Sequence, residues 1–465
     1  MALKIYNTLK REKVEFRTVH KGVARIYSCG PTVYNYPHIG NLRSFVFSDT
    51  LRRYIKYKGY NVLHVMNLTD VDDKTIKGSK SEGVSLKLFT EKYTKFFFDD
   101  LAALNIEKVE HYPKATENIP EMVRIVKALL DKGIAYTSDD GSIYFSVSKF
   151  KDYGKLSKIE SNNLMAGARV KQDEYAKESA NDFALWKSYD ENDGDVFWET
   201  EIGKGRPGWH IECSAMSMKY LGETLDVHTG GIDLIFPHHE NEIAQSEAYT
   251  GKPFANFWVH CEHLLVNGEK MSKSKGNFYV LKDILSKGYS PKAVRYLLIG
   301  THYRQNLNFT FESLGAATQT VEKFREFMSR LKEVKEGKQD PDFKQIILDY
   351  KNRFEEAMDD DLNMSVALSH IFEFMKEINK KVSENNLSRQ NALEAYNLMM
   401  EFDKVLGIFD FKEDAIPDEI KALAEKRLIA RKNKDWAESD RIRDVIKEKG
   451  YVVGDSKEGY TLKKA

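Results

Sequence analysis

The amino-acid sequence predicts an α/β fold. We expect a doubly wound parallel sheet with an inserted α/β domain, followed by an α-helical bundle and a small C-terminal α+β domain. Two observations predict the sheet: residues 23–66 have the pattern strand, loop, helix, strand of a parallel βαβ unit, and residues 205–250 are again rich in glycine. A third predicts the bundle, because residues 313–405 are charged helical sequence without a strand pattern.

Composition limits the kind of protein. The chain has 465 residues, enough for about two to four domains. Lysine plus arginine and aspartate plus glutamate each number 71, so any basic surface must be local. No apolar run reaches about 18 residues, which argues against a membrane span, and the N-terminus lacks the apolar core of a signal peptide. Three widely spaced cysteines do not make a disulfide framework, so we expect a reduced, cytoplasmic protein.

The first βαβ unit has reactive side chains in its loop. Cys29, His38 and Gly40 lie there, and a helical pattern of apolar residues follows and ends at Gly59. Ligands bind beyond the carboxyl ends of parallel strands, and the free N–H groups of a helix start suit a phosphate. The loop lacks Gly-x-Gly-x-x-Gly, which argues against a nicotinamide dinucleotide.

Changes in residue pattern divide the rest of the chain. A helical pattern at 122–130 and an alternating strand at 143–147 precede charged sequence with weak periodicity up to about residue 200, which we interpret as an insertion. Basic helices and a short hairpin are expected at the C-terminus. The predicted segments are the first half of the sheet domain (1–120), a connective insertion (121–204), the second half of the sheet domain (205–250), a mixed segment (251–312), the helical bundle (313–405) and the C-terminal domain (406–465).

Two pairs of metal-binding residue types occur at helical spacing. His210 and Cys213 are three residues apart and His238 and Glu242 are four apart, so each pair shares one face of a helix. These residue types are ordinary zinc ligands, and Cys29 could complete a set of four. No Cys-x-x-Cys pair anchors the set, so spacing alone leaves structural histidines and a buried cysteine as the alternative.

A lysine-rich loop follows a predicted strand at 264–266. Lysines and serines alternate between Gly268 and Gly276. A solvated basic turn is the simpler interpretation. Several ammonium and hydroxyl donors in one loop are also what a developing pyrophosphate requires.

Several motifs, in order along the chain, resemble those of one enzyme family. His38-Ile-Gly-Asn41 and Lys270-Met-Ser-Lys-Ser274 are similar to the signature pair of class I aminoacyl-tRNA synthetases. Within that class the chain resembles the cysteinyl-tRNA synthetases over almost its whole length. The other matching stretches are residues 29–34, 67–74, 182–187, 208–216, 226–233, 236–246, 293–296 and 436–441. The resemblance implies a Rossmann-like catalytic domain, a stem-contact segment that carries the lysine loop, and a C-terminal anticodon-binding domain.

The resemblance implies one zinc ion, which binds the thiol of the substrate cysteine. Its implied ligands are Cys29, Cys213, His238 and Glu242. His210 and His239 are not carried over as ligands, and Cys261 is interpreted as a free thiol. The implied remainder of the cysteine pocket is Thr69, Trp209 and His228. Zinc favours a thiolate over the hydroxyl of serine, whereas other pockets separate such similar side chains by only about 10².

The resemblance also implies an ATP site with Mg²⁺ and a two-step reaction. Cysteinyl-adenylate and pyrophosphate would form from L-cysteine and ATP, and tRNA(Cys) would then accept the cysteinyl group on its terminal ribose. The implied catalytic residues are His38, Asn41, Lys270 and Lys273, and the implied ATP-binding residues are His38, Gly40, Asp233 and Lys273. Asn41 replaces the family's histidine; its amide keeps a donor but cannot be cationic.

A basic run near the C-terminus precedes an aromatic residue. Five lysines and arginines lie within 426–434, and Trp436 follows. Such sequence can contact phosphates and stack on unpaired bases, although a solvated helix with Trp436 in a small core is the alternative from the residues alone. The resemblance implies that the anticodon is recognised by Arg431, Trp436, Asp440 and Asp455. A monomer is expected.

Three other functions are weighed against this one. A ligase that joins cysteine to an amino sugar shares the catalytic half but lacks the C-terminal region, and a small-molecule nucleotidyltransferase is far shorter. An RNA-binding protein without catalysis would not need to retain Lys270 and Lys273. Lys74 and Lys77 resemble a motif linked in this family to pyridoxal-phosphate-dependent persulfide formation, with paired surface lysines as the alternative.

Overall fold

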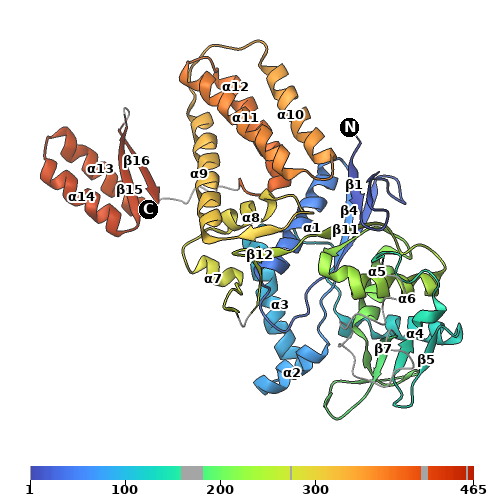
Figure 1. Cartoon of the computed structure of the whole chain (residues 1–465). Coiled ribbons are helices and arrows are strands. Elements are labelled where there is room, and N and C mark those ends of the chain that lie inside the picture. The colour runs from blue at the N-terminus through green and yellow to red at the C-terminus, as the bar shows by residue number, and fades with distance from the viewer. Residues whose placement is uncertain (1, 159–181, 273–274, 410–416, 457–458, 465) are drawn as a thin grey trace. The chain divides into compact units, whose positions relative to one another are not determined.

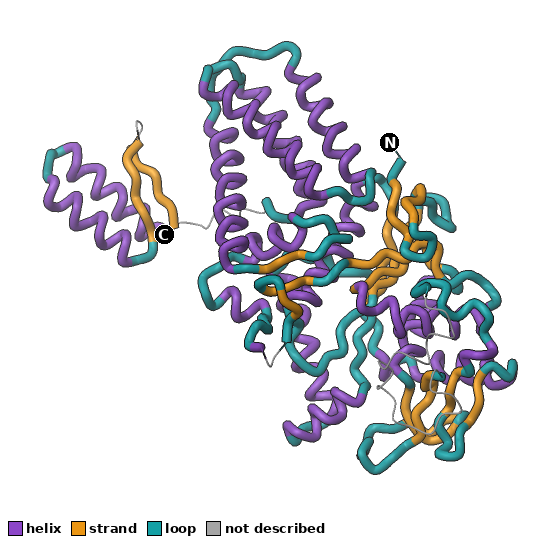
Figure 2. Tube along the Cα trace, viewed as in Figure 1, coloured by secondary structure: helices purple, strands orange, loops and turns teal. Residues whose placement is uncertain are grey.

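The computed structural model describes residues 2–158, 182–272, 275–409, 417–456 and 459–464 (Figure 1). The chain divides into two compact units, Met1–Ile408 and Phe409–Ala465. In the larger unit, the strands lie in the first three quarters of the sequence and four long helices follow them (Figure 2). None of the helices in the described ranges is long and apolar enough to cross a membrane.

A four-stranded parallel sheet forms the centre of the larger unit. Its strands are β3 (Val23–Ser28), β4 (Asn61–Met66), β10 (Leu225–Gly231) and β11 (Ala255–Cys261), in the order β11-β10-β3-β4. The chain moves from β3 to one edge and later from β10 to the other edge, so the topology reverses between β3 and β10. This confirms the predicted parallel sheet, and ligands bind such sheets beyond the carboxyl ends of the strands at the reversal.

Helices cover both faces of this sheet. α1 (Ile39–Tyr57) joins β3 to β4, and α6 (Glu240–Thr250) joins β10 to β11. Because the two connections run to opposite edges and such connections are right-handed, α1 and α6 lie on opposite faces. α5 (Trp209–Leu221) packs beside α6, and both contribute to one apolar cluster with Tyr27. The predicted apolar stripe of α1 is buried, namely Leu42, Phe45, Val46, Leu51 and Ile55.

An antiparallel sheet lies between the two halves of the parallel sheet in the sequence. Its strands, in spatial order, are β5 (Ala135–Thr137), β6 (Ile143–Phe145), β7 (Phe183–Ser188), β9 (Gly203–Pro207) and β8 (Trp198–Thr200). α4 (Ile119–Asp131) packs against it through an apolar cluster. The helix and the first strand pattern predicted here are confirmed. The weak periodicity up to residue 200 did not predict β7, β8 or β9, and residues 159–181 lie outside the described ranges.

The remaining elements of the larger unit follow in sequence. They are β1 (Lys4–Asn7), β2 (Glu12–Glu15), α2 (Asp73–Glu82), α3 (Leu86–Ala103), β12 (Leu264–Val266), β13 (Glu269–Lys270), α7 (Leu281–Leu285), α8 (Pro291–Gly300), β14 (Leu307–Phe309), α9 (Phe311–Glu333), α10 (Phe343–Asp359), α11 (Met364–Ser383) and α12 (Arg389–Leu406). The last four helices form the predicted bundle. The boundaries of the six segments stay predictions.

A buried arginine connects the sheet domain to the bundle. Arg295 on α8 is 1% exposed and donates to the carboxylate of Asp49 on α1 at 2.6 Å. It also donates to three backbone carbonyls, those of Leu104, Asn105 and Leu406 at 3.0, 3.2 and 2.7 Å. Breaking a buried ion pair by removing one partner typically costs about 3–5 kcal/mol. This contact therefore makes α1 and the end of the bundle parts of one folded unit.

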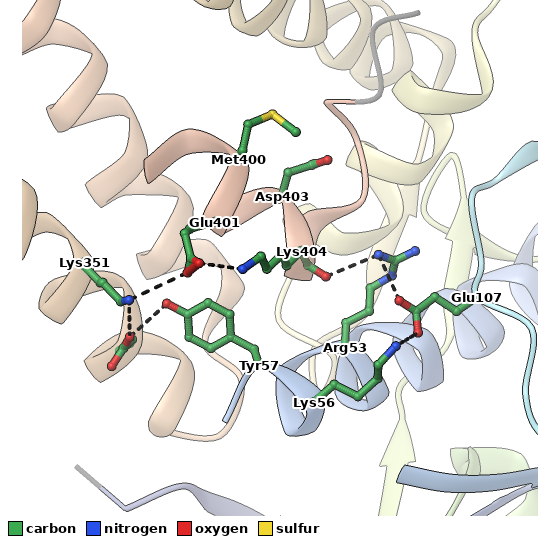
Figure 3. Close-up of a pocket in the computed structure, with 10 residues that line it drawn as sticks. Arg53, Lys56, Tyr57, Glu107, Lys351, Met400, Glu401, Asp403 and Lys404 are labelled. Carbon is green, nitrogen blue, oxygen red and sulfur yellow. Dashed lines mark hydrogen bonds and ion pairs between the residues drawn. The ribbon is translucent and has the colours of Figure 1, made fainter. Parts of the chain in front are cut away.

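A cavity of about 700 Å³ lies between α1, α10 and α12 (Figure 3). Its charged side chains pair with one another: Arg53 and Lys56 with Glu107, and Lys351 and Lys404 with Glu401. The first two pairs lie within the sheet domain and the other two within the bundle, and Arg53 connects the two parts by donating to the Lys404 carbonyl at 3.3 Å. We assign no ligand to the cavity.

The smaller unit consists of two helices and a hairpin. α13 (Asp418–Lys432) and α14 (Trp436–Glu448) precede the antiparallel strands β15 (Tyr451–Ser456) and β16 (Gly459–Lys464), which confirms the predicted hairpin. The buried apolar residues of this unit are Ile420, Ala424, Ile442, Ile446 and Val453.

Candidate active site and metal centre

Four possible metal ligands meet beyond the carboxyl end of β3. Cys29 follows this strand, and Cys213 lies on α5. His238 lies in the helical turn Ile235–His239 just before α6, and Glu242 lies in the first turn of α6. Their donor atoms are all within 4.8 Å of one another. The two sulfurs are 4.0 Å apart, and His238 Nε2 is 3.5 Å from Cys213 Sγ and 3.1 Å from Glu242 Oε1. The structure thus brings together the four residues that the sequence pointed to.

A second set of four donors shares two of these residues. Cys29, His228, His239 and Glu242 also have donor atoms within 4.8 Å of one another. His239 Nε2 is 3.3 Å from Cys29 Sγ. Geometry alone therefore admits either set. The set with two thiols is the softer one, and zinc sites rich in sulfur are common.

The donor groups are buried, which disfavours their charged forms. Burial raises the pKa of the Cys29 and Cys213 thiols and that of the Glu242 carboxyl, and it lowers the pKa of His238. A divalent cation reverses this balance, because metal ligands bind as thiolate, carboxylate and neutral imidazole. Four such donors in contact therefore fit a metal ion.

Neighbouring histidines fix the orientation of the donors. His210 Nδ1 lies 2.9 Å from His238 Nδ1, which leaves His238 Nε2 toward Cys213 and Glu242. His228 Nε2 lies 2.8 Å from Glu242 Oε2. Hydrogen bonds of this kind hold metal ligands in their binding orientation. His210 is thus placed to support a ligand.

Trp209 and His228 contact these donors, and Thr69 contacts the residue that precedes Cys213. The Trp209 ring stacks on His238 with centroids 4.0 Å apart. Thr69 follows β4, and its hydroxyl donates to Glu212 at 2.8 Å. Glu212 is buried beside Cys213, and burial raises its pKa. Reasoning from the sequence missed Glu212, because helical spacing alone does not show that an acidic residue turns inward.

The start of α1 lies beside the lysine loop. His38 Nδ1 accepts from the backbone N–H of Asn41, and Asn41 Oδ1 accepts from that of His38. This pair caps the helix and puts the proton of a neutral His38 on Nε2. Burial lowers the pKa of His38, which favours the neutral ring.

The segment after the lysine loop is tied to this helix start. Ile39 N–H donates to the Tyr279 carbonyl at 3.0 Å, and a Cβ on Gly40 would lie 2.8 Å from the Met271 methyl group. Lys270 is exposed on β13. Lys273 lies outside the described residues. Asp233, in the turn after β10, is close enough to His38 to influence its pKa.

Cys261 lies apart from the donor sets. It ends β11 and belongs to neither group of possible metal ligands found among the described residues. It borders a small cavity with Arg43 and Phe47, and burial raises its pKa to about 12.

Three of the predicted anticodon residues meet in the smaller unit. The Trp436 ring is 57% exposed, so it does not lie in the core. The Arg431 guanidinium lies 5.5 Å from the ring centroid, and Asp455 accepts from Arg431 at 3.1 Å. Asp440 follows Trp436 by one helical turn and pairs with Arg443 at 3.3 Å. This exposed aromatic and basic surface can stack on an unpaired base.

Comparison with solved structures supports the fold. The chain resembles the Mycobacterium tuberculosis methionyl-tRNA synthetase in complex with methionyl-adenylate with a TM-score of 0.59 and 16% identity, over 83% of this chain and 90% of that one. A ternary complex of Agrobacterium radiobacter LeuRS, tRNA and LeuAMS gives a TM-score of 0.61 at 12% identity, over 84% and 85% of the two chains.

Comparison of sequences identifies the family. Three family models match: the catalytic domain of class I (C) tRNA synthetases at 15–319, a DALR domain at 353–410, and a cysteinyl-tRNA ligase anticodon binding domain at 413–461. The cysteine–tRNA ligase of Protochlamydia amoebophila is 49% identical over 99% of this chain and 98% of its own length. That of Leptospira interrogans is 47% identical over 99% of both. The chain therefore belongs to the cysteine–tRNA ligase family of class I aminoacyl-tRNA synthetases.

Proposed function

We propose that the protein ligates L-cysteine to tRNA(Cys) in two steps. Cysteine and ATP give cysteinyl-adenylate and pyrophosphate, and the cysteinyl group then passes to the 3′-terminal ribose of the tRNA. The observation that supports this most is that a sulfur-rich donor set and a helix start, which suits a phosphate, both follow the inner strand β3 at its carboxyl end. One chain supplies every candidate residue, so the enzyme can act as a monomer in the cytoplasm, where its three substrates meet.

We infer that Cys29, Cys213, His238 and Glu242 hold one Zn²⁺. Two thiols within contact of an imidazole and a carboxylate support this choice of ion. Zinc, when bound, supplies a Lewis acid that prefers sulfur to a hydroxyl oxygen, which separates cysteine from serine. His210 holds His238 in its binding orientation, and Trp209 forms a wall of the pocket by stacking on the same ring.

We infer that the start of α1 binds ATP, with Mg²⁺ accompanying the phosphates. His38 would donate its Nε2 proton to the α-phosphate, where negative charge develops. Gly40 and Asp233 would border the nucleotide. The amide oxygen of Asn41 is used by the helix cap, so only its N–H groups can serve ATP. Lys270 and Lys273 would stabilise the departing pyrophosphate.

Amino-acid-dependent exchange between ATP and pyrophosphate tests the proposal. We expect exchange with cysteine and none above background with serine, alanine or methionine. Exchange that depends on another amino acid would assign a different substrate. No exchange with any amino acid would favour an RNA-binding protein without catalysis.

The smaller unit should affect tRNA and leave cysteine activation unchanged. We expect Trp436→Ala to lower kcat/KM for tRNA(Cys), because one exposed stacking contact is lost. The loss corresponds to about 1–3 kcal/mol of transition-state stabilisation. Asp440→Ala should act in the same direction. Steady-state aminoacylation measures this effect, and exchange of pyrophosphate should stay at the wild-type rate.

Glu448→Ala, near the other end of the same helix, is the matched control and should change neither activity. If Trp436→Ala lowered both activities together, the residue would have a structural role and anticodon recognition would have to be assigned elsewhere.

A further inference from the structure

A buried carboxyl group beside the candidate metal centre has few hydrogen-bond partners among the described residues. Glu212 precedes Cys213 on α5 and is 1% exposed. Within the described residues one donor reaches it, the Thr69 hydroxyl at 2.8 Å from Oε2, and no ion pair forms. A buried carboxyl group is stabilised by several hydrogen bonds or by a nearby cation, and the Thr69 hydroxyl supplies one such bond. A cation bound at Thr69 would stabilise Glu212 further.

A line of hydrogen bonds connects this carboxyl group to the residue that follows Cys29. Asn67 Nδ2 donates to the Thr69 hydroxyl at 3.2 Å, and Asn67 Oδ1 accepts from the Gly30 N–H at 2.9 Å. A Cβ on Gly30 would overlap the Asn67 carbonyl oxygen, so this close approach requires glycine. Gly30 adjoins Cys29 and Glu212 adjoins Cys213. The line thus runs between the two residues that carry the thiols.

The other acidic residues near Thr69 are already engaged. Asp70 accepts two hydrogen bonds from Thr116, at 2.9 and 2.6 Å. Asp72 caps α2 and accepts from the backbone N–H of Lys74. Glu212 is the acid of this group that faces Thr69 itself.

We propose that Glu212 is a positioning residue that holds the α-ammonium group of the substrate cysteine through Thr69. The inference rests on the proposed function, in which cysteine brings a cation three bonds from its sulfur. Because the Thr69 hydroxyl donates its proton to Glu212, its oxygen can only accept from the ammonium group. The thiol is then fixed at the four donors and the ammonium group at Thr69. The pocket selects an α-amino acid and rejects a simple thiol.

Calorimetric binding to the zinc-loaded, full-length protein tests this role. Cysteine is compared with 3-mercaptopropionate, which has the same thiol and carboxylate but no amino group. Glu212→Gln keeps the size of the side chain and removes its charge. We expect this variant to weaken the affinity for cysteine about tenfold to a hundredfold, as for the loss of a charge-assisted hydrogen bond. The affinity for 3-mercaptopropionate should change by less than about twofold.

Variants of Thr69 and a nearby acid provide the controls. Thr69→Val should reduce the ratio of the affinity for cysteine to that for 3-mercaptopropionate, as Glu212→Gln does. Thr69→Ser should leave this ratio unchanged. These two decide the question even if Glu212→Gln does not fold. Asp72→Asn removes a neighbouring charge but keeps a capping side chain, so it should have a much smaller effect.

Equal weakening of both ligands by Glu212→Gln and Thr69→Val would overturn the inference, because it would mean a structural role. Wild-type protein that bound serine as tightly as cysteine would instead contradict the proposed function.

Discussion

Cys213→Ala is expected to remove zinc from the protein and to abolish cysteine-dependent exchange of pyrophosphate. The Cys213 sulfur is buried and lies within reach of Cys29 and His238. Loss of a mere hydrogen-bond partner of a ligand typically costs 10–100-fold in metal affinity, so loss of a ligand should cost more than about 100-fold. Elemental analysis of the purified variant measures the zinc, and the exchange assay measures the activity.

Two histidine variants distinguish the two possible sets of donors. His238→Ala should lose zinc as Cys213→Ala does, whereas His239→Ala should retain it. The reverse result would assign the metal to the set that contains His228 and His239. Cys261→Ser is the matched cysteine control and should keep one zinc per chain. Wild-type protein without zinc would contradict the whole assignment.

Lys270→Ala is expected to slow adenylate formation by about 10²–10³ and to leave the affinity for cysteine near that of wild type. Its ammonium group acts where negative charge develops on the phosphates, so its loss should appear in the rate of the chemical step. Rapid-quench measurement of a single turnover gives that rate. We expect Lys273→Ala to behave in the same way.

Lys275→Ala is the control for the lysine loop. This lysine lies in the same loop but pairs with Glu269 at 2.8 Å, so its removal should change the rate little. A single-turnover rate in Lys270→Ala equal to that of wild type would mean that the lysine loop is a solvated turn.

The first βαβ unit could be predicted from the sequence, because short apolar strand segments flank a stretch whose apolar residues recur at helical spacing. The strands of the insertion could not. β9 is Gly-Lys-Gly-Arg-Pro, whose composition is poor in strand-forming residues, and it is held in place by pairing with β7 and β8. Tertiary pairing determines such a strand, and a single sequence does not record it.

Helical spacing in the sequence could predict pairs of possible metal ligands, but it could not predict which four residues form the set. His238 and His239 are neighbours in sequence, and both approach Cys29 or Glu242 in the structure. The two rings differ in the partner of the second nitrogen: Nδ1 of His238 contacts His210, and Nδ1 of His239 contacts His260. The resemblance to a family pointed to His238. Glu212 was not predicted, because its role depends on a hydroxyl 143 residues away in the sequence.

The contact between Arg295 and Asp49 determines when the catalytic domain can finish folding during synthesis. Asp49 leaves the ribosome 246 residues before Arg295, which corresponds to roughly 10–50 s at ordinary rates of synthesis. Until then the Asp49 carboxylate lacks the Arg295 guanidinium, and this part of α1 stays incompletely packed. The Leu406 carbonyl, which also accepts from Arg295, emerges later still. The nascent catalytic half therefore has to wait for the helical bundle, and a ribosome that stalls before the end of α12 would carry an unfinished domain.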